Sequence, residues 1–195
     1  MEIIRCGEWG AVPVDTSKLA RTRALGIVIH HTASLNLDPL EDPAVERDRV
    51  FRLARSIQQA HQKWRWIDSG QHFTIGRSGI ILEGRHGSLA AAKAGKVIRA
   101  AHAGEEHANA ELYGIECEGL YQTEPVPEAL WKSLVELCSW LSFWGRFQSQ
   151  KIHPHRRFRA TICPGDVLVG RIEELRSRVH DRKFWIIKAA QVDPG

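Results

Sequence analysis

The stretch "LGIVIHHTAS" at residues 25–34 carries the main evidence for the type of fold. Its β-branched run predicts a buried strand over residues 25–31. Successive side chains of a strand point to opposite faces, so only one of His30 and His31 can face a given site. An isolated pair of this kind is most simply interpreted as core or supporting histidines.

Around this strand, helical and strand patterns alternate along the chain. Apolar residues at helical spacing predict a helix over 43–64, with Asp42 as its N-cap and Pro43 in its first position. The same spacing predicts a second helix, which ends at Gly145. The segments "QHFTI" and "GIILEG" predict a hairpin with Gly79 near its turn, and 112–120 is a predicted strand. A third helix is expected at about 165–180, and 88–96 is a loop or short helix. This order predicts an α/β domain with a central mixed β-sheet flanked by helices.

Two sets of apolar positions define the predicted helices. They are Val50, Leu53, Ile57, Ala60 and Trp64 in the first, and Leu130, Leu134, Leu137, Leu141 and Trp144 in the second.

Size and composition limit the protein classes. A chain of 195 residues with 43% hydrophobic content suits one compact domain, which we place at 1–182, with 183–195 as a C-terminal tail of uncertain structure. No apolar run reaches the length of a membrane-spanning helix, and the N-terminus lacks a signal-peptide pattern. The net charge of +4 favours an anionic partner, but the scattered Lys and Arg residues argue against nucleic acid.

A second stretch, "HPHRRFRATICPG" at residues 153–165, contains two histidines and Cys163. A catalytic zinc site uses three protein ligands and leaves a fourth position for water. One histidine from 30–31, one from 153–155 and Cys163 would supply such a set. The alternative is a cysteine nucleophile with a histidine base, although such cysteines usually lie at a helix N-terminus. The other cysteines match no metal or redox spacing.

Five segments occur in the order found in one family: "EWGA", "IVIHHTAS", "IQQAHQKWRWIDSGQHFTIGRSGIILEGR", "HAGEEHANAELYGIECEG" and "HRRFRATICPGD". Over about residues 5–170 the chain resembles the zinc-dependent N-acetylmuramoyl-L-alanine amidases, which include phage endolysins and peptidoglycan recognition proteins. The resemblance implies one Zn²⁺ per chain in a surface cleft. It also implies hydrolysis of the amide between N-acetylmuramic acid and L-alanine, in peptidoglycan or muropeptides. We expect a monomer, made in the cytoplasm unless a leader is missing, that acts at the cell wall after release.

The resemblance also implies roles for particular residues. It places the metal on His30, His155 and Cys163, because the family's late histidine precedes the cysteine by eight residues. His153, ten residues before Cys163, is the weaker choice, because relatives with that spacing end in aspartate. Thr161 matches a position that orients water or the oxyanion.

The general base is where the chain departs from its family. Many members have a tyrosine at the position of Gln71, and a glutamine side chain can donate a hydrogen bond but cannot act as a general acid or base. The acidic position of "GIECEG" that matches a catalytic glutamate in other amidases is Glu116. Glu118 shares its strand face and is the alternative from alternation alone.

Four further residues are expected to bind substrate: His102, Asn109, Gln71 and Arg85. Two alternatives to the enzyme are a peptidoglycan-recognition module without catalysis and a structural zinc protein that binds nucleic acid. Recognition modules have typically lost a zinc ligand, which favours the enzyme here. The structural zinc protein requires compact ligand pairs, which the sequence lacks.

Overall fold

The computed structural model describes the backbone of residues 1–192 and the side chains of residues 1–182. Its centre is a five-stranded sheet in the order β4-β3-β6-β2-β7. The β3–β4 pair is antiparallel and the other pairs are parallel, so the predicted mixed sheet is confirmed. The strands are β2 (Gly26–His31), β3 (Phe73–Ile75), β4 (Ile81–Glu83), β6 (Leu112–Cys117) and β7 (Ile152–Pro154).

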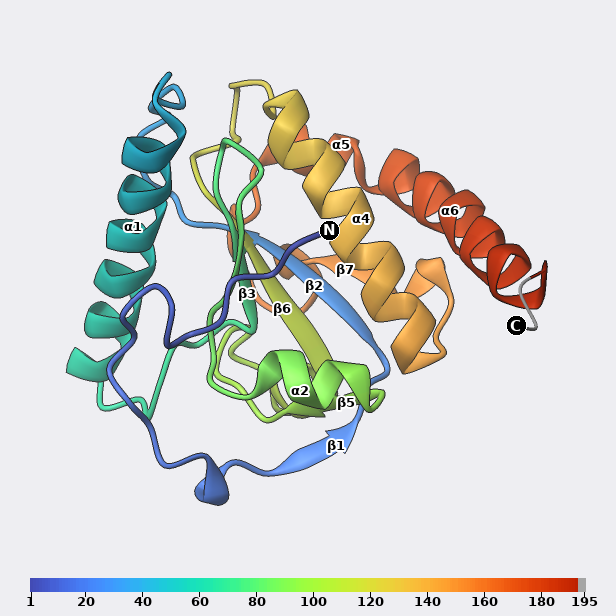
Figure 1. Cartoon of the computed structure of the whole chain (residues 1–195), viewed down its shortest axis with the longest axis horizontal. Coiled ribbons are helices and arrows are strands. Elements are labelled where there is room, and N and C mark those ends of the chain that lie inside the picture. The colour runs from blue at the N-terminus through green and yellow to red at the C-terminus, as the bar shows by residue number, and fades with distance from the viewer. Residues whose placement is uncertain (193–195) are drawn as a thin grey trace.

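Helices cover the sheet on both sides, with α1 on one side and α4 and α6 on the other (Figure 1). A separate two-stranded sheet pairs β1 (Arg21–Arg23) with β5 (Lys96–Ile98). Within the described residues, no helix is both long and apolar enough to cross a membrane. The α-helices are α1 (Pro43–Lys63), α2 (Ser88–Lys93), α3 (Glu106–Glu111), α4 (Glu128–Gly145), α5 (Asp166–Gly170) and α6 (Ile172–Val192).

Strand alternation divides β2 and β6 between two environments. Ile27 and Ile29 of β2, with Ile115 of β6, join the main core formed with α4 and α6. The intervening residues Val28 and Leu112 pack with Ala103 and Ala108 on the opposite face. That second face also carries His30, which pairs in register with Glu116 of β6. The face that avoids the main core is therefore the one available for chemistry.

Helix α1 begins as predicted, but it buries a different stripe. The Asp42 side chain accepts hydrogen bonds from the Ala44 and Val45 amides, with Pro43 in the first turn. The buried positions are Glu46, Val50, Ala54 and Gln58, whereas Trp64 is 62% exposed beyond the last turn. Of the predicted stripe, Val50 is buried, Leu53 and Ile57 are half-buried, and Ala60 and Trp64 are exposed. The buried stripe is shifted because two polar side chains are buried with partners: Glu46 bonds Arg49, and Gln58 bonds Asp68.

Two C-terminal expectations also need correction. The segment expected as one helix at 165–180 is split into α5 and a longer α6, which continues to Val192 through most of the stretch described as a tail of uncertain structure. Residues 193–195 of that tail lie outside the described part of the chain. In α4 the four predicted leucines are buried, but Trp144 is 42% exposed.

An ion network ties α1 to the end of β6. Arg49 of α1 bonds both carboxylates of Glu46 and Glu118, and the Glu118 side chain is only 4% exposed. Glu118 also accepts a hydrogen bond from the Arg77 amide. A buried carboxylate is tolerated only with such partners, so Arg49 supports the position of the β6 C-terminus.

Replacing Arg49 by methionine should leave Glu118 buried without its cation. We expect Arg49→Met to lower the free energy of unfolding by about 3 kcal/mol, measured by urea denaturation. The matched control is Arg52→Met, which removes an exposed pair with Asp48 on the same helix and should cost less than about 1 kcal/mol. Equal effects of the two substitutions would contradict this account of the network.

Candidate metal centre

A surface cleft of about 420 Å³ opens at the carboxyl ends of β2 and β6. Ligand sites in sheets with parallel strands usually lie at this edge. The cleft is lined by most of the residues predicted to carry the chemistry, which are His30, Gln71, His102, Glu116, His155, Thr161 and Cys163. The fold therefore brings together residues that lie up to 133 positions apart in the chain.

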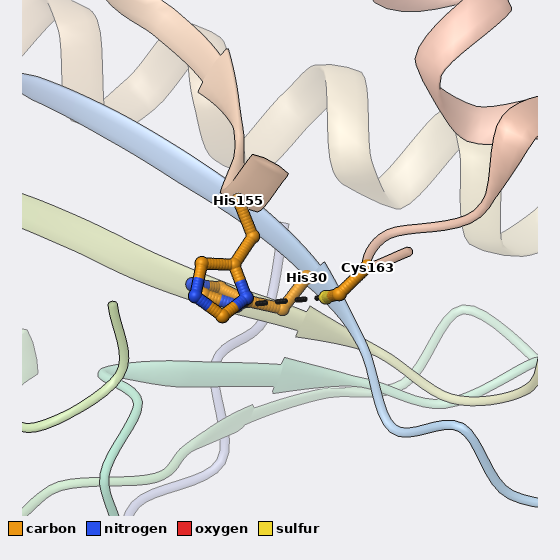
Figure 2. Close-up of side chains that lie close together, drawn as sticks. All are labelled: His30, His155 and Cys163. Atoms are coloured by element: carbon orange, nitrogen blue, oxygen red, sulfur yellow. Dashed lines mark hydrogen bonds between the residues drawn. The ribbon is translucent and has the colours of Figure 1, made fainter. Parts of the chain in front are cut away.

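Three potential metal ligands converge in the cleft. One ligand atom each from His30, His155 and Cys163 lies within 4.8 Å of the other two. Figure 2 shows the three side chains, with a contact of 3.8 Å between His30 Nδ1 and Cys163 Sγ. Tetrahedral zinc with ordinary Zn–N and Zn–S bonds separates two such atoms by about 3.6 Å. His153 is outside this group, with Nδ1 3.4 Å from Arg176 and its ring against Phe158.

Hydrogen bonds to backbone carbonyls fix which nitrogen of each histidine is free. The Nε2 of His102 lies 3.1 Å from the Leu112 carbonyl, which can only accept, so this nitrogen carries the proton. His102 Nδ1 must then accept from His30 Nε2, at 3.0 Å, which leaves the His30 Nδ1 lone pair facing Cys163. His155 Nε2 donates to the Ala103 carbonyl at 3.3 Å, so its Nδ1 is likewise free.

These imidazoles are neutral, as metal ligands must be. Burial and the neighbouring His102 and His155 lower the pKa of His30 well below its usual value. Burial also lowers the pKa of His155 and brings that of His102 to about 4. The Nδ1 atom of His155 is buried and has no hydrogen-bond partner. An orphaned lone pair, a second imidazole and a thiol form a donor set that fits Zn²⁺.

Cys163 lacks the environment of a cysteine nucleophile. Burial raises the pKa of its thiol to about 12, although the His31 amide donates to Sγ. Nucleophilic cysteines instead have a pKa lowered by a cation or a helix N-terminus. A thiol of this kind ionises when a cation binds to it, which favours the metal-ligand interpretation over the thiol-hydrolase one.

Glu116 and Glu118 differ in the groups that their carboxyls contact. Glu118 is held by Arg49 away from the cleft, whereas Glu116 lines the cleft. The Oε2 atom of Glu116 is buried without a hydrogen-bond partner, and burial raises the pKa of its carboxyl to about 7. A carboxyl in this state can both accept and release a proton near neutral pH.

Gln71 and Thr161 both line the cleft with groups available to a ligand. Gln71 Nε2 donates to Thr74, while its Oε1 is buried and has no partner. The Thr161 hydroxyl accepts from the Cys163 amide at 3.2 Å, so its own proton is free to donate outward. These contacts place two polar groups beside the metal cluster and the Glu116 carboxyl.

Two residues expected to bind substrate do not line the cleft. Asn109 Oδ1 accepts from the Ala103 amide, so it positions the loop whose carbonyl holds His155. Arg85 is 5% exposed, and its guanidinium donates to the Ser69 carbonyl, within the fold rather than toward solvent. In this structure both residues therefore make supporting contacts, and their part in substrate binding stays a prediction. His102 does line the cleft, and it also orients His30.

The sequence pattern does not indicate the aromatic residues at the cleft. His61, Trp64 and Trp66 line it, and the two indole rings pack edge to face at 5.2 Å. The helical spacing of Trp64 predicts a buried position instead. Arg65 between the two tryptophans has a φ of +64°, and this left-handed residue turns the chain out of the helix. Nothing in the local pattern indicates that turn.

Comparison with known proteins identifies the family. The family model for N-acetylmuramoyl-L-alanine amidases (Amidase_2) matches residues 20–166. The chain belongs to this amidase family. Peptidoglycan recognition protein 1 of Bos indicus is 28% identical over 174 residues, covering 88% of this chain and 83% of the relative. The protein of the same name from Rattus norvegicus is 29% identical over 169 residues, covering 85% of this chain and 82% of the relative.

Solved amidase-family structures share the fold. The N-acetylmuramoyl-L-alanine amidase LysC from Clostridium intestinale superposes with a TM-score of 0.66 at 23% identity, covering 92% of this chain and 97% of LysC. A point mutant of Drosophila PGRP-LB, in complex with tracheal cytotoxin, gives a TM-score of 0.71 at 25% identity. That comparison covers 87% of this chain and 92% of PGRP-LB. The α/β fold with a mixed sheet is therefore that of the amidase family.

The hydrogen bond from His30 to His102 should strengthen metal binding, because it fixes the ligand tautomer before the metal arrives. We expect His102→Ala to weaken Zn²⁺ binding about 10–100-fold, measured by competition with a chromogenic chelator. His107→Ala is the control, because His107 is exposed on α3 and pairs with Glu111. Unchanged affinity in His102→Ala would contradict the assigned tautomers.

Proposed function

We propose that this protein is a zinc-dependent N-acetylmuramoyl-L-alanine amidase. It would hydrolyse the amide that joins the lactyl group of N-acetylmuramic acid to the L-alanine of the stem peptide. The observation that carries the proposal is the convergence of His30, His155 and Cys163 in one cleft with the unpaired carboxyl of Glu116. Membership of the amidase family supports the substrate class.

The metal would be held by His30 Nδ1, His155 Nδ1 and Cys163 Sγ. Zn²⁺ in such a site supplies Lewis acidity toward the amide carbonyl and lowers the pKa of water to near neutrality. The remaining proton transfers require a protein group, because the amine of L-alanine leaves only after it gains a proton.

Glu116 is proposed to make both proton transfers. Its ionised carboxylate accepts a proton from the attacking water, and the resulting acid donates it to the leaving nitrogen. The unpartnered Oε2 and a pKa raised to about 7 suit both steps. Gln71 stands at the position where many family members have a tyrosine. The polar groups near Glu116 in the cleft are therefore the Gln71 amide and the Thr161 hydroxyl. The hydroxyl can donate to the substrate or the oxyanion.

Zinc dependence can be tested with two histidine variants. We expect about one Zn²⁺ per purified chain by elemental analysis. We also expect the protein to release new N-terminal alanine from peptidoglycan, and a chelator to abolish this release. His155→Ala should lose both the metal and the activity. His153→Ala should keep both, because its imidazole faces Arg176 rather than the cluster. A metal-free active protein, or loss of zinc in both variants, would contradict the proposal.

Glu116 can be tested separately from the metal. Glu116→Gln should retain zinc but lower kcat about 10²–10⁴-fold, because the amide cannot transfer a proton. In the wild type the ionised form is required, so kcat/KM should fall as the pH drops below the pKa of Glu116. That pKa is about 7 without metal and lower beside a bound dication. Full activity of Glu116→Gln would exclude it as the base.

The second candidate function is peptidoglycan recognition without catalysis. The similarity to peptidoglycan recognition protein 1, and the glutamine at position 71, favour it. A recognition module would bind a soluble muropeptide without releasing alanine, and Glu116→Gln would leave its affinity unchanged. The alanine-release assay therefore separates the two functions directly.

A further inference from the structure

A second hollow lies at the other end of β2 from the metal cluster. Its volume is about 980 Å³, and its lining combines cationic and aromatic side chains: Arg23, Lys93, Phe143, Trp144 and Arg146. It shares no lining residue with the cleft. Figure 1 shows β1, α2 and the C-terminal end of α4 grouped together at this lower end of the molecule. A strand of β2's length separates the two sites by roughly 20 Å.

The positive charges around the hollow are not balanced within the fold. Arg23 pairs directly opposite Lys96 in the β1–β5 ladder, an arrangement in which like charges repel. In the described part of the chain, none of Arg23, Lys93, Lys96 and Arg146 forms an ion pair with a carboxylate. A pair of like charges such as this one opposes the stability of the fold, and features of that kind are expected at functional or strained sites.

The C-terminal ends of two helices stabilise some of these four cations but not all of them. Lys93 is in the last turn of α2, and Arg146 caps the C-terminus of α4, where the helix dipole favours cations. Arg23 and Lys96 lie on strands and have no such compensation. Arg23 is thus the lining cation whose charge neither a helix end nor a carboxylate compensates.

Trp144 adds an apolar surface to the same hollow. It is 42% exposed, and its ring packs edge to face against Phe143 at 5.4 Å and near Trp140 at 6.5 Å. The indole is therefore held in place at the wall of the hollow. A fixed aromatic face suits the apolar side of a sugar or polyol, and guanidinium groups suit phosphate oxygens.

We propose that this hollow binds an anionic wall polymer made of sugar or polyol units joined by phosphodiesters. Arg23, Lys93 and Arg146 contact phosphates, and Trp144 contacts the unit between them. The site would hold the protein on the wall while the cleft at the opposite end of β2 engages the stem peptide. Nucleic acid is disfavoured as the ligand because, among the described residues that line the hollow, Trp144 alone offers an indole for stacking bases.

The test compares two variants with the same change in net charge. The hollow variant combines Arg23→Gln, Lys93→Gln and Arg146→Gln, and the control combines Arg5→Gln, Arg47→Gln and Lys132→Gln at exposed positions elsewhere. Binding of purified poly(glycerol phosphate) to the full chain is measured by calorimetry at low salt. We expect roughly 100-fold weaker binding by the hollow variant and at most a few-fold change in the control.

Three outcomes would overturn the proposal: no binding by the wild type, equal losses in both variants, or equal affinity of the wild type for DNA with the same number of phosphates. Thermal unfolding should show that the hollow variant stays folded with a stability near that of the wild type, because the relief of repulsion between Arg23 and Lys96 offsets the loss of the helix-dipole interactions of Lys93 and Arg146. Trp144→Ala is a second probe that leaves the charges intact, and it should weaken binding several-fold at a salt concentration that screens the charges.

Discussion

The parallel pairing of β2 with β6 is the constraint on which the rest of the site depends. It places His30 beside Glu116 on one face while Ile29 and Ile115 enter the core on the other. A slip of one residue would turn His30 into the core and an isoleucine into the cleft. The packing of α4 against the isoleucines therefore maintains the register that the chemistry requires.

Backbone carbonyls then give the imidazoles their direction. The carbonyls of Leu112 and Ala103 accept from His102 and His155, and His102 in turn accepts from His30. Gly114 makes this possible, because a Cβ there would lie 2.6 Å from the His102 ring. The two histidine lone pairs are oriented by the fold itself, which lowers the cost of ordering them when a ligand binds.

The two glutamates near the end of β6 differ in charge environment because their side chains contact different groups. Glu118 is neutralised by Arg49 and connects a helix to the sheet. Glu116 lies two residues earlier with an unpartnered oxygen, and burial raises its pKa to about 7. Equivalent residue types on one strand face thus differ in role because one faces a cation from α1 and the other faces the cleft.

Local patterns in the sequence were sufficient for the fold class and the start of α1 at Asp42 and Pro43, and the resemblance of a short motif to the amidase family selected His155 and Cys163. These features depend on neighbours within one turn, one strand or one short motif. The exposure of Trp64, the separation of Glu116 from Glu118 and the role of His102 could not be predicted in this way. The separation of the glutamates and the role of His102 depend on groups from other segments, Arg49 and the Leu112 carbonyl, which only the tertiary structure brings into contact. The exposure of Trp64 follows from the left-handed turn at Arg65, which no local pattern indicates.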